Sequence, residues 1–423
     1  MMRFATSPTG DMHIDTLRVA IINHLVAKQR QEPFLVRIDD GDKSQNIEGK
    51  DTEIMQILEK FAIMHDQVFH QSEHLHMHQT LAIRLLEEKK AFICTCSTEG
   101  EPVCQSGNCA QMEREAYTKL KAQEEPFVIR AHKPEAPVLL DDAIQGMLTF
   151  EPQRIGEITI LDAKGLPSWL FASACDDMLS DISLLVSPYA QQEATAKQIH
   201  LKELLGYQTQ SRYAHLGALL TLSGEKAEEA EETSLLWLFS QGFIPDAIVN
   251  YLLLLGNEKA PQEPFTLPEA LAWFELDALS ASAVTFDLEK LRELNREHLK
   301  RIDDKQLSAL FGFADADIGK LAKLYLDEVS TIQELEAVIK PIFSPKPFEN
   351  EHEEVMRKLQ QVLIDAPMFQ TFEELEAYVQ EETGFSPKEI EQPLRLLLTG
   401  ADHGPALSKI YPYIRCYLLE VIS

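Results

Sequence analysis

The residues best suited to hold a metal ion are cysteines that lie close together in the first third of the chain. The sequence has six cysteines, and four of them form one cluster: Cys94, Cys96, Cys104 and Cys109. Thiolates at such short intervals can converge on a tetrahedral Zn²⁺ ion. We expect a closed, structural zinc site with these four ligands. The alternative is a group of free thiols in a metal-free module.

The elements around this cluster begin with strands that alternate with helices. Residues 3–5 and 34–38 have the composition of short strands. Apolar residues recur at helical spacing over residues 16–29 and again over residues 54–61. Strands and helices that alternate in this way predict βαβ units and a parallel sheet, which is an α/β fold.

The pattern changes after residue 90 and resumes near residue 156. Residues 91–155 contain the cysteines, several prolines and short apolar strings, which indicate an inserted α+β module. Residues 156–208 again alternate strands with helices, and the chain beyond residue 208 is mostly helical in pattern. We therefore expect a parallel-sheet domain split by an insert and followed by a helical half.

Composition sets limits on the class of protein. A chain of 423 residues predicts about two to four domains. No apolar run approaches the ~20 residues that span a membrane, and the N-terminal residues lack a secretory signal, so we expect a cytoplasmic protein with no membrane partner. The net charge of −29 lowers the expectation of tight nucleic-acid binding, although a local basic patch can suffice.

Several strings of residues resemble one known family, in order along the chain. Residues 3–14, RFATSPTGDMHI, are similar to the string RFAPSPTGxLHIG. Residues 37–42, RIDDGD, resemble RIEDTD, and residues 165–172 resemble the TPTYNFA region of the same family. Further similar strings follow as far as residues 393–405. The family is that of the glutamyl-tRNA synthetases, class I enzymes, and the resemblance covers essentially the whole chain.

This resemblance implies a fold and a division into domains. It implies a split Rossmann-like catalytic domain over residues 1–90 and 156–208, with the zinc-type, acceptor-binding module at 91–155. It further implies a stem-contact region at 209–300 and a helical anticodon-binding domain at 301–423. Within the insert, Cys94, Cys96 and Cys109 resemble zinc-ligand positions of the family, and Cys104 is the expected fourth ligand.

The resemblance also implies an ATP site. The family joins glutamate to ATP, with Mg²⁺, as an adenylate and then transfers glutamate to the 3′ end of tRNA. Thr9, Gly10, His13 and Lys226 match the ATP-binding positions, and His13 and Lys226 match catalytic ones. A strand, a loop and a helix N-terminus place backbone N–H groups near phosphates, and a histidine there can donate to a phosphate oxygen.

The amino-acid pocket implied by the resemblance consists of Arg3, Ser7, Asp39 and Trp169. The guanidinium of Arg3 can bind a carboxylate through two hydrogen bonds. Asp39 is expected to hold the substrate ammonium group. It is one methylene shorter than the glutamate of the family, and Trp169 replaces a tyrosine and so lacks its hydroxyl.

Three places in the chain depart from the family pattern, and the first is the HIGH-type motif. It is His13-Ile14-Asp15-Thr16 in this chain, with an aspartate where the family has glycine. Asp15 adds bulk and negative charge where adenine should lie against bare backbone. The alternative interpretation is an ordinary helix N-cap, which Asp and Thr both favour.

The second departure is the loop that resembles KMSKS. It has the sequence KAEEA at residues 226–230, and the second lysine of the family falls at Glu229. At ~4 Å and an effective dielectric constant of ~20, one charge pair contributes about 4 kcal/mol, so the reversed charge should disfavour the leaving pyrophosphate. The alternative is a solvated acidic helix over residues 225–232.

The third departure replaces a cation of the amino-acid pocket. The family string RGEDH falls at residues 187–191, which are SPYAQ, so Ser187 stands where the family has arginine. Losing one buried charge-assisted hydrogen-bond partner typically costs ~1.5–3 kcal/mol.

Two hypotheses follow from these departures. The favoured one is a weakly active or non-catalytic, regulatory paralogue that binds tRNA for Glu or Gln, with another synthetase or an amidotransferase as a further candidate partner. The alternative is an active glutamate–tRNA ligase with divergent motifs.

Overall fold

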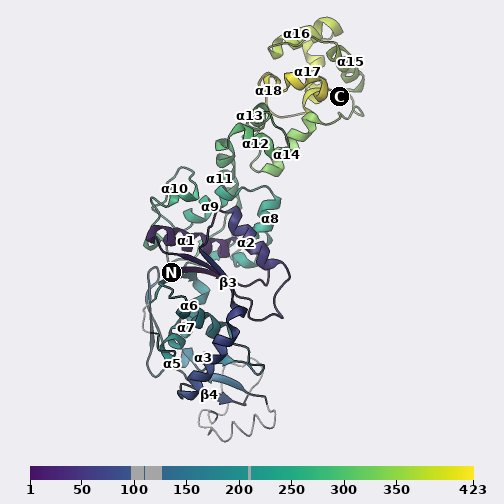
Figure 1. Ribbon diagram of the computed structural model, residues 1–423. Coiled ribbons are helices and arrows are strands. Elements are labelled where there is room, and N and C mark those ends of the chain that lie inside the picture. Colours follow the sequence, from purple (N-terminus) through teal and green to yellow (C-terminus); the bar gives the residue numbers. More distant parts are fainter. Residues whose placement is uncertain (97–108, 110–125, 208–210) are drawn as a thin grey trace. The chain divides into compact units, whose positions relative to one another are not determined.

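The computed structural model describes residues 1–96, 109, 126–207 and 211–423 (Figure 1). The chain forms two compact units. The first contains Met1–Leu236 and Val249–Asp287, and the second contains Trp237–Ile248 and Leu288–Ser423. Within the described residues, no helix combines the length and the apolar character that a membrane crossing requires.

The first unit is built around a seven-stranded sheet. All neighbouring strands pair in parallel except the last two, which form an antiparallel hairpin. The expected parallel sheet of an α/β fold is therefore confirmed. In spatial order the strands are β3 (Gln67–His70), β2 (Phe34–Ile38), β1 (Met2–Thr6), β9 (Leu184–Pro188), β10 (Arg212–Leu216), β6 (Val138–Asp142) and β7 (Gly146–Phe150).

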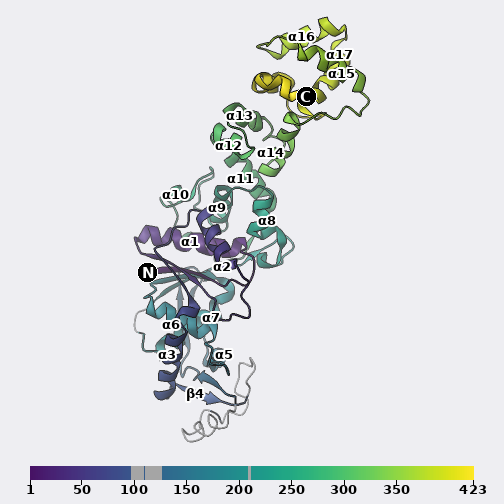
Figure 2. The same cartoon turned by 45° about the vertical axis from the view of Figure 1, so that its right-hand side comes forward.

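Helices cover both faces of this sheet (Figure 1 and Figure 2). Helix α1 (Ile14–Arg30) packs against β1 and β9 on one face. Helices α6 (Trp169–Leu179) and α7 (Gln192–Leu204) cover the other face, where their apolar residues share a core with alternate strand residues such as Leu35 and Leu185. Because side chains of a strand alternate between faces, Arg3 and Arg37 also point towards α6.

A smaller sheet lies beside this core. It consists of β4 (Ala91–Cys94), β5 (Val128–Ala131) and β8 (Ile158–Leu161), which pair in antiparallel order. Helix α3 (Leu75–Glu87) leads into β4, and its apolar residues join the same core. Further elements of this unit in the described residues include α2 (Lys50–Lys60), α5 (Pro152–Ile155), α10 (Leu267–Ala270), β11 (Leu219–Leu220) and β12 (Val284–Thr285).

Strand pairing differs from the division expected from the sequence at two places. Strands β6 and β7 fall in the segment 91–155 expected to form the insert, yet they extend the seven-stranded sheet. Strand β10 falls in the part with a mostly helical pattern, yet it lies between β9 and β6. Both results depend on long-range hydrogen bonding, which local periodicity does not reveal.

The second unit is helical, as expected for the C-terminal half. Its large core includes Leu299, Ile339, Leu359 and Leu397, all essentially buried. Several helices begin with a capping box, as at Thr371 and Glu374. Helices α8 (Leu235–Ser240) and α9 (Pro245–Leu254) belong partly to each unit, and the others are α11 (Leu288–Arg301), α12 (Asp304–Leu310), α13 (Ala316–Leu324), α14 (Ile332–Ile339), α15 (Glu353–Ile364), α16 (Phe372–Thr383), α17 (Pro387–Thr399), α18 (Leu407–Ile414) and α19 (Leu418–Val421).

Candidate active site

A cavity of about 380 Å³ lies where β1 ends and α1 begins. Ligands of open α/β sheets bind at the carboxyl ends of the strands, so this is the expected place for a phosphate-bearing substrate. Thr9, Gly10 and His13 line the cavity, so the structure brings together three of the four predicted ATP-binding residues. Ser7, predicted for the amino-acid pocket, lines it as well.

The fourth predicted ATP-binding residue, Lys226, does not line this cavity in the described part of the chain. Its side chain is 60% exposed, and its Nζ lies 3.4 Å from a carboxylate oxygen of Glu228. Glu228 does line the cavity, and it directly precedes Glu229, where the second lysine of the family is expected. The loop thus presents a carboxylate to the cavity and directs its lysine to solvent.

The first turn of α1 adds the carboxylate of Asp15 to the cavity, which Asp11 of the preceding loop also lines. His13 is the N-cap residue with extended backbone, and its side chain makes no cap hydrogen bond. Asp15 and Thr16 lie inside the helix, so the alternative that either of them caps it is wrong. Burial raises the pKa of Asp15, and the nearby negative charge of Glu228 raises it further.

The loop that resembles KMSKS forms two short 3₁₀ turns, Ala227–Glu229 and Glu231–Thr233, so the expected acidic helix is wrong. The hydroxyl of Thr233 donates to the backbone carbonyls of Ala227 and Ala230, and such side-chain bonds compete with helical ones. Thr233 Oγ1 also lies 3.1 Å from Nδ1 of His13. The loop is therefore tied to the residue that should face the phosphates.

The predicted amino-acid pocket is a buried network of charged side chains. Arg3 donates from Nε and Nη2 to the two carboxylate oxygens of Asp177, at 2.7 and 3.0 Å. Asp177 also accepts from Nη1 of Arg37 at 3.0 Å. Burial alone would raise the pKa of Asp177, but Arg3, Lys202 and Arg37 hold it well below its usual range. The arginine expected to bind a substrate carboxylate is thus paired with a carboxylate of the chain itself.

Asp39, expected to hold the substrate ammonium, also has partners within the protein. Arg37 donates to its two oxygens at 2.6 and 3.3 Å. The indole N–H of Trp169 donates to Oδ2 at 2.9 Å. The structure therefore brings Asp39 and Trp169 together, and the indole supplies a donor in place of the lost tyrosine hydroxyl.

Lys202, a further buried cation of this network, was not predicted from the sequence. Its Nζ lies 3.6 Å from Asp177, and burial lowers its pKa while Asp177 opposes that shift. Only the helical phase of α7 could have indicated that Lys202 faces the core. Ser187, at the position of the family arginine, is buried near the end of β9 and carries no charge.

The described cysteines of the cluster converge. The Sγ atoms of Cys94, Cys96 and Cys109 lie within 4.8 Å of one another, and those of Cys96 and Cys109 are 3.2 Å apart. Cys94 and Cys109 are buried. Cys104 lies outside the described residues. Three convergent thiols fit the donor set that zinc prefers.

Comparison with known proteins places this fold and these motifs in one class. Residues 1–293 match the family described as "tRNA synthetases class I (E and Q), catalytic domain", and residues 272–414 match "Anticodon binding domain". The fold is that of a class I aminoacyl-tRNA synthetase. More specifically, the chain belongs to the glutamyl-tRNA synthetase family.

Relatives of this family match over the full length. The chain is 53% identical to glutamate–tRNA ligase 2 of Sulfurovum sp., 42% to glutamate–tRNA ligase 2 of Sulfurimonas denitrificans and 42% to glutamate–tRNA ligase 1 of Nitratiruptor sp., with 100% of each chain covered. Among solved structures, a glutamate tRNA ligase from Elizabethkingia meningosepticum shares the fold, with a TM-score of 0.82 at 20% identity over 99% of this chain and 97% of that one.

Proposed function

We propose that this protein is a tRNA-binding member of its family that forms glutamyl adenylate weakly or not at all. The substrates of the family reaction are ATP with Mg²⁺, glutamate and tRNA for Glu or Gln. In this proposal, tRNA remains a ligand, whereas ATP and glutamate bind poorly. A partner such as another synthetase or an amidotransferase would then act on the bound tRNA.

The observation that carries the proposal is the charge of the cavity at the start of α1. Three carboxylates, Asp11, Asp15 and Glu228, line it, and the part of its lining that the structure describes contains no lysine or arginine. Lys50 and Lys226, which pair with Asp11 and Glu228, lie outside that lining. A triphosphate there meets like charges. One such contact at ~4 Å and an effective dielectric constant of ~20 costs about 4 kcal/mol, which corresponds to roughly three orders of magnitude in rate.

The second pocket supports the same conclusion. Arg3 and Asp39, the groups meant for the carboxylate and ammonium of glutamate, are bound by Asp177 and Arg37. A substrate would have to displace these buried, charge-assisted bonds. With Ser187 in place of a cation, the pocket has one positive charge fewer to bind the substrate in place of these bonds.

The alternative, an active glutamate–tRNA ligase, is favoured by the relatives of that name that match over the full length. In that case Mg²⁺ would have to offset the carboxylates of the cavity, and Lys226 would have to turn from Glu228 towards the phosphates. Lys226 is exposed, so its side chain is free to make such a turn.

The test is glutamate-dependent exchange of pyrophosphate into ATP, measured with and without tRNA for Glu or Gln. We expect a rate close to that of the His13→Ala variant, because the wild-type site forms the adenylate weakly or not at all. Rapid exchange by the wild type that His13→Ala abolishes would refute the proposal and establish the alternative. Gel retention of the same tRNAs, performed in parallel, tests whether tRNA binding persists.

A further inference from the structure

A second group of metal-type side chains lies next to the charge network, outside the cysteine cluster. His74 is the N-cap residue of α3, and His78 lies one turn further along. Nδ1 of His74 is 2.9 Å and Nε2 of His78 is 2.7 Å from the same oxygen, Oδ1 of Asp176 on α6. All three potential ligand atoms lie within 4.8 Å of one another. Residues four apart on a helix share a face, which explains why both rings reach one carboxylate.

Neighbouring groups hold these side chains in place. Gln71 donates from Nε2 to the other oxygen of Asp176 at 2.9 Å. The ring of Phe69 packs against that of His74, with ring centroids 4.5 Å apart. Asp176 is fully buried. Outer contacts that orient carboxylate and imidazole ligands in this way are characteristic of protein metal sites.

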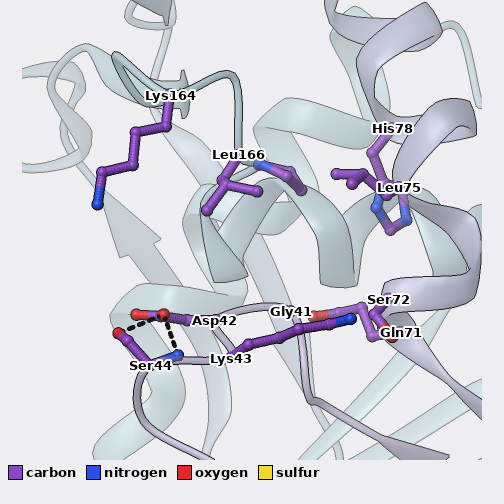
Figure 3. A pocket seen from close by; sticks show the side chains of 11 residues that line it. Gly41, Asp42, Lys43, Ser44, Gln71, Ser72, Leu75, His78, Lys164 and Leu166 are labelled. Carbon is purple, nitrogen blue, oxygen red and sulfur yellow. Dashed lines mark hydrogen bonds between the residues drawn. The ribbon is translucent and has the colours of Figure 1, made fainter.

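A cavity of about 410 Å³ adjoins the group (Figure 3). His78 and Gln71 line it, and so do Lys43 and Lys164. Figure 3 shows His78 on one side of the cavity and Lys164 on the other. Water or an anionic group therefore has room to reach an ion bound by the two histidines.

We infer that His74, His78 and Asp176 bind a divalent transition-metal ion of the zinc type. Two imidazoles and one carboxylate are a donor set that suits zinc, whereas magnesium prefers oxygen ligands alone. Ligand atoms of a tetrahedral zinc ion lie roughly 3.3 Å apart, so the distance from each ring nitrogen to Oδ1 of Asp176 needs to grow by only about half an ångström. Water from the cavity supplies the fourth ligand.

The surrounding charges tolerate such an ion. Nη1 of Arg37 lies 4.0 Å from Oδ2 of Asp176, on the oxygen that faces away from the histidines. That guanidinium is already paired with Asp39 and Asp177. Its charge is therefore largely neutralised before it acts on a cation at Oδ1.

The experiment is a zinc titration of the full chain after metal removal. Calorimetry measures the affinity, and metal analysis after dialysis measures the bound zinc. Because the cysteine cluster is a separate candidate site, the measurement compares variants. His78→Gln should lower the bound zinc by about one ion per chain, and His74→Ala, at a half-exposed position, should weaken that site at least about tenfold. The matched control is His76→Ala, which changes an exposed histidine of the same helix and should leave binding unchanged.

The absorption spectrum of bound Co²⁺ distinguishes the two candidate sites, because their ligands differ. Co²⁺ bound by thiolates absorbs strongly in the near ultraviolet, and Co²⁺ bound by nitrogen and oxygen does not. We expect the His74→Ala variant to keep the thiolate absorption while its affinity for the other Co²⁺ ion falls at least about tenfold. Equal stoichiometry and affinity in the wild type and in both histidine variants, each folded by circular dichroism, would overturn the inference and leave the two histidines as hydrogen-bond donors to Asp176.

Discussion

Individual carboxylates of the first unit have opposite roles. Asp177 is held by three cations and organises the buried network. Asp15 and Glu228 face a cavity whose described lining contains no lysine or arginine, and the lysine beside Glu228, Lys226, lies outside that lining. Carboxylates thus stabilise the amino-acid pocket through Asp177, and in our proposal they repel ATP from the cavity at the start of α1.

A further buried carboxylate, Asp142, predicts how stability depends on pH. It accepts from Nδ1 of His215 at 2.5 Å and from the backbone N–H groups of Ile144 and Gln145. Burial would raise the pKa of Asp142, but the hydrogen bonds from His215, Gln145 and Ile144 lower it overall. Its charged form therefore contributes stability above the unfolded pKa of ~3.9, and this contribution is lost as pH falls through the lower folded value.

We expect Asp142→Asn to lower the free energy of unfolding by about 2–4 kcal/mol at pH 7, because it breaks a buried pair. The loss should shrink as the pH falls from about 4 towards the lower folded pKa, because the wild-type carboxyl then takes up a proton on unfolding. Urea unfolding of both proteins at pH 7 and pH 3 measures the difference. A gap of the same size at both pH values would show that the charge of Asp142 contributes nothing.

Sequence predicted the residues of this site that lie within one continuous string. Thr9, Gly10 and His13 belong to a single loop between a strand and a helix, so their proximity follows from local structure. The pairing of Arg3 with Asp177 joins residues 174 positions apart. That contact, and the burial of Lys202 beside it, depends on how α6 and α7 pack on the sheet, which no local pattern contains.

Among the elements, α1 and the parallel character of the sheet were predicted, whereas the places of β6, β7 and β10 in that sheet were not. The apolar spacing over residues 16–29 indicated α1, which the structure places at Ile14–Arg30. Strands β6 and β7 were assigned to the insert because they follow the cysteines in sequence, yet β6 pairs with β10. Hydrogen bonding between distant strands decides this arrangement, and one sequence offers no direct sign of it.

The cysteine cluster leads to a prediction about the small sheet that contains β4. If three described thiols and Cys104 bind zinc, Cys109→Ser should remove about one zinc ion per chain, because metal affinity depends on every thiolate. Metal analysis of purified protein measures this. Cys416→Ser changes an exposed cysteine elsewhere and should leave the zinc content unchanged. Equal zinc in the wild type and Cys109→Ser would exclude the cluster as a site.

For the whole molecule, the net charge of −29 limits how tRNA binds. Binding that persists against this charge must use local cations at phosphates, and such contacts weaken steeply as salt rises. We expect tRNA retention at ~50 mM salt to fall by at least about tenfold at ~200 mM. Retention on a gel across this range tests the expectation. Affinity independent of salt would mean that binding does not rest on phosphate contacts.

The central claim is that acidic residues exclude ATP from the cavity at the start of α1. Its most direct test is the dissociation constant of ATP with Mg²⁺, measured by calorimetry for the wild type and for the Asp15→Gly, Glu228→Lys double variant. We predict no measurable binding to the wild type at millimolar ATP and an affinity at least about a hundredfold higher in the double variant, since each like-charge contact costs a few kcal/mol. Tight binding of ATP by the wild type, unchanged in the double variant, would contradict the claim.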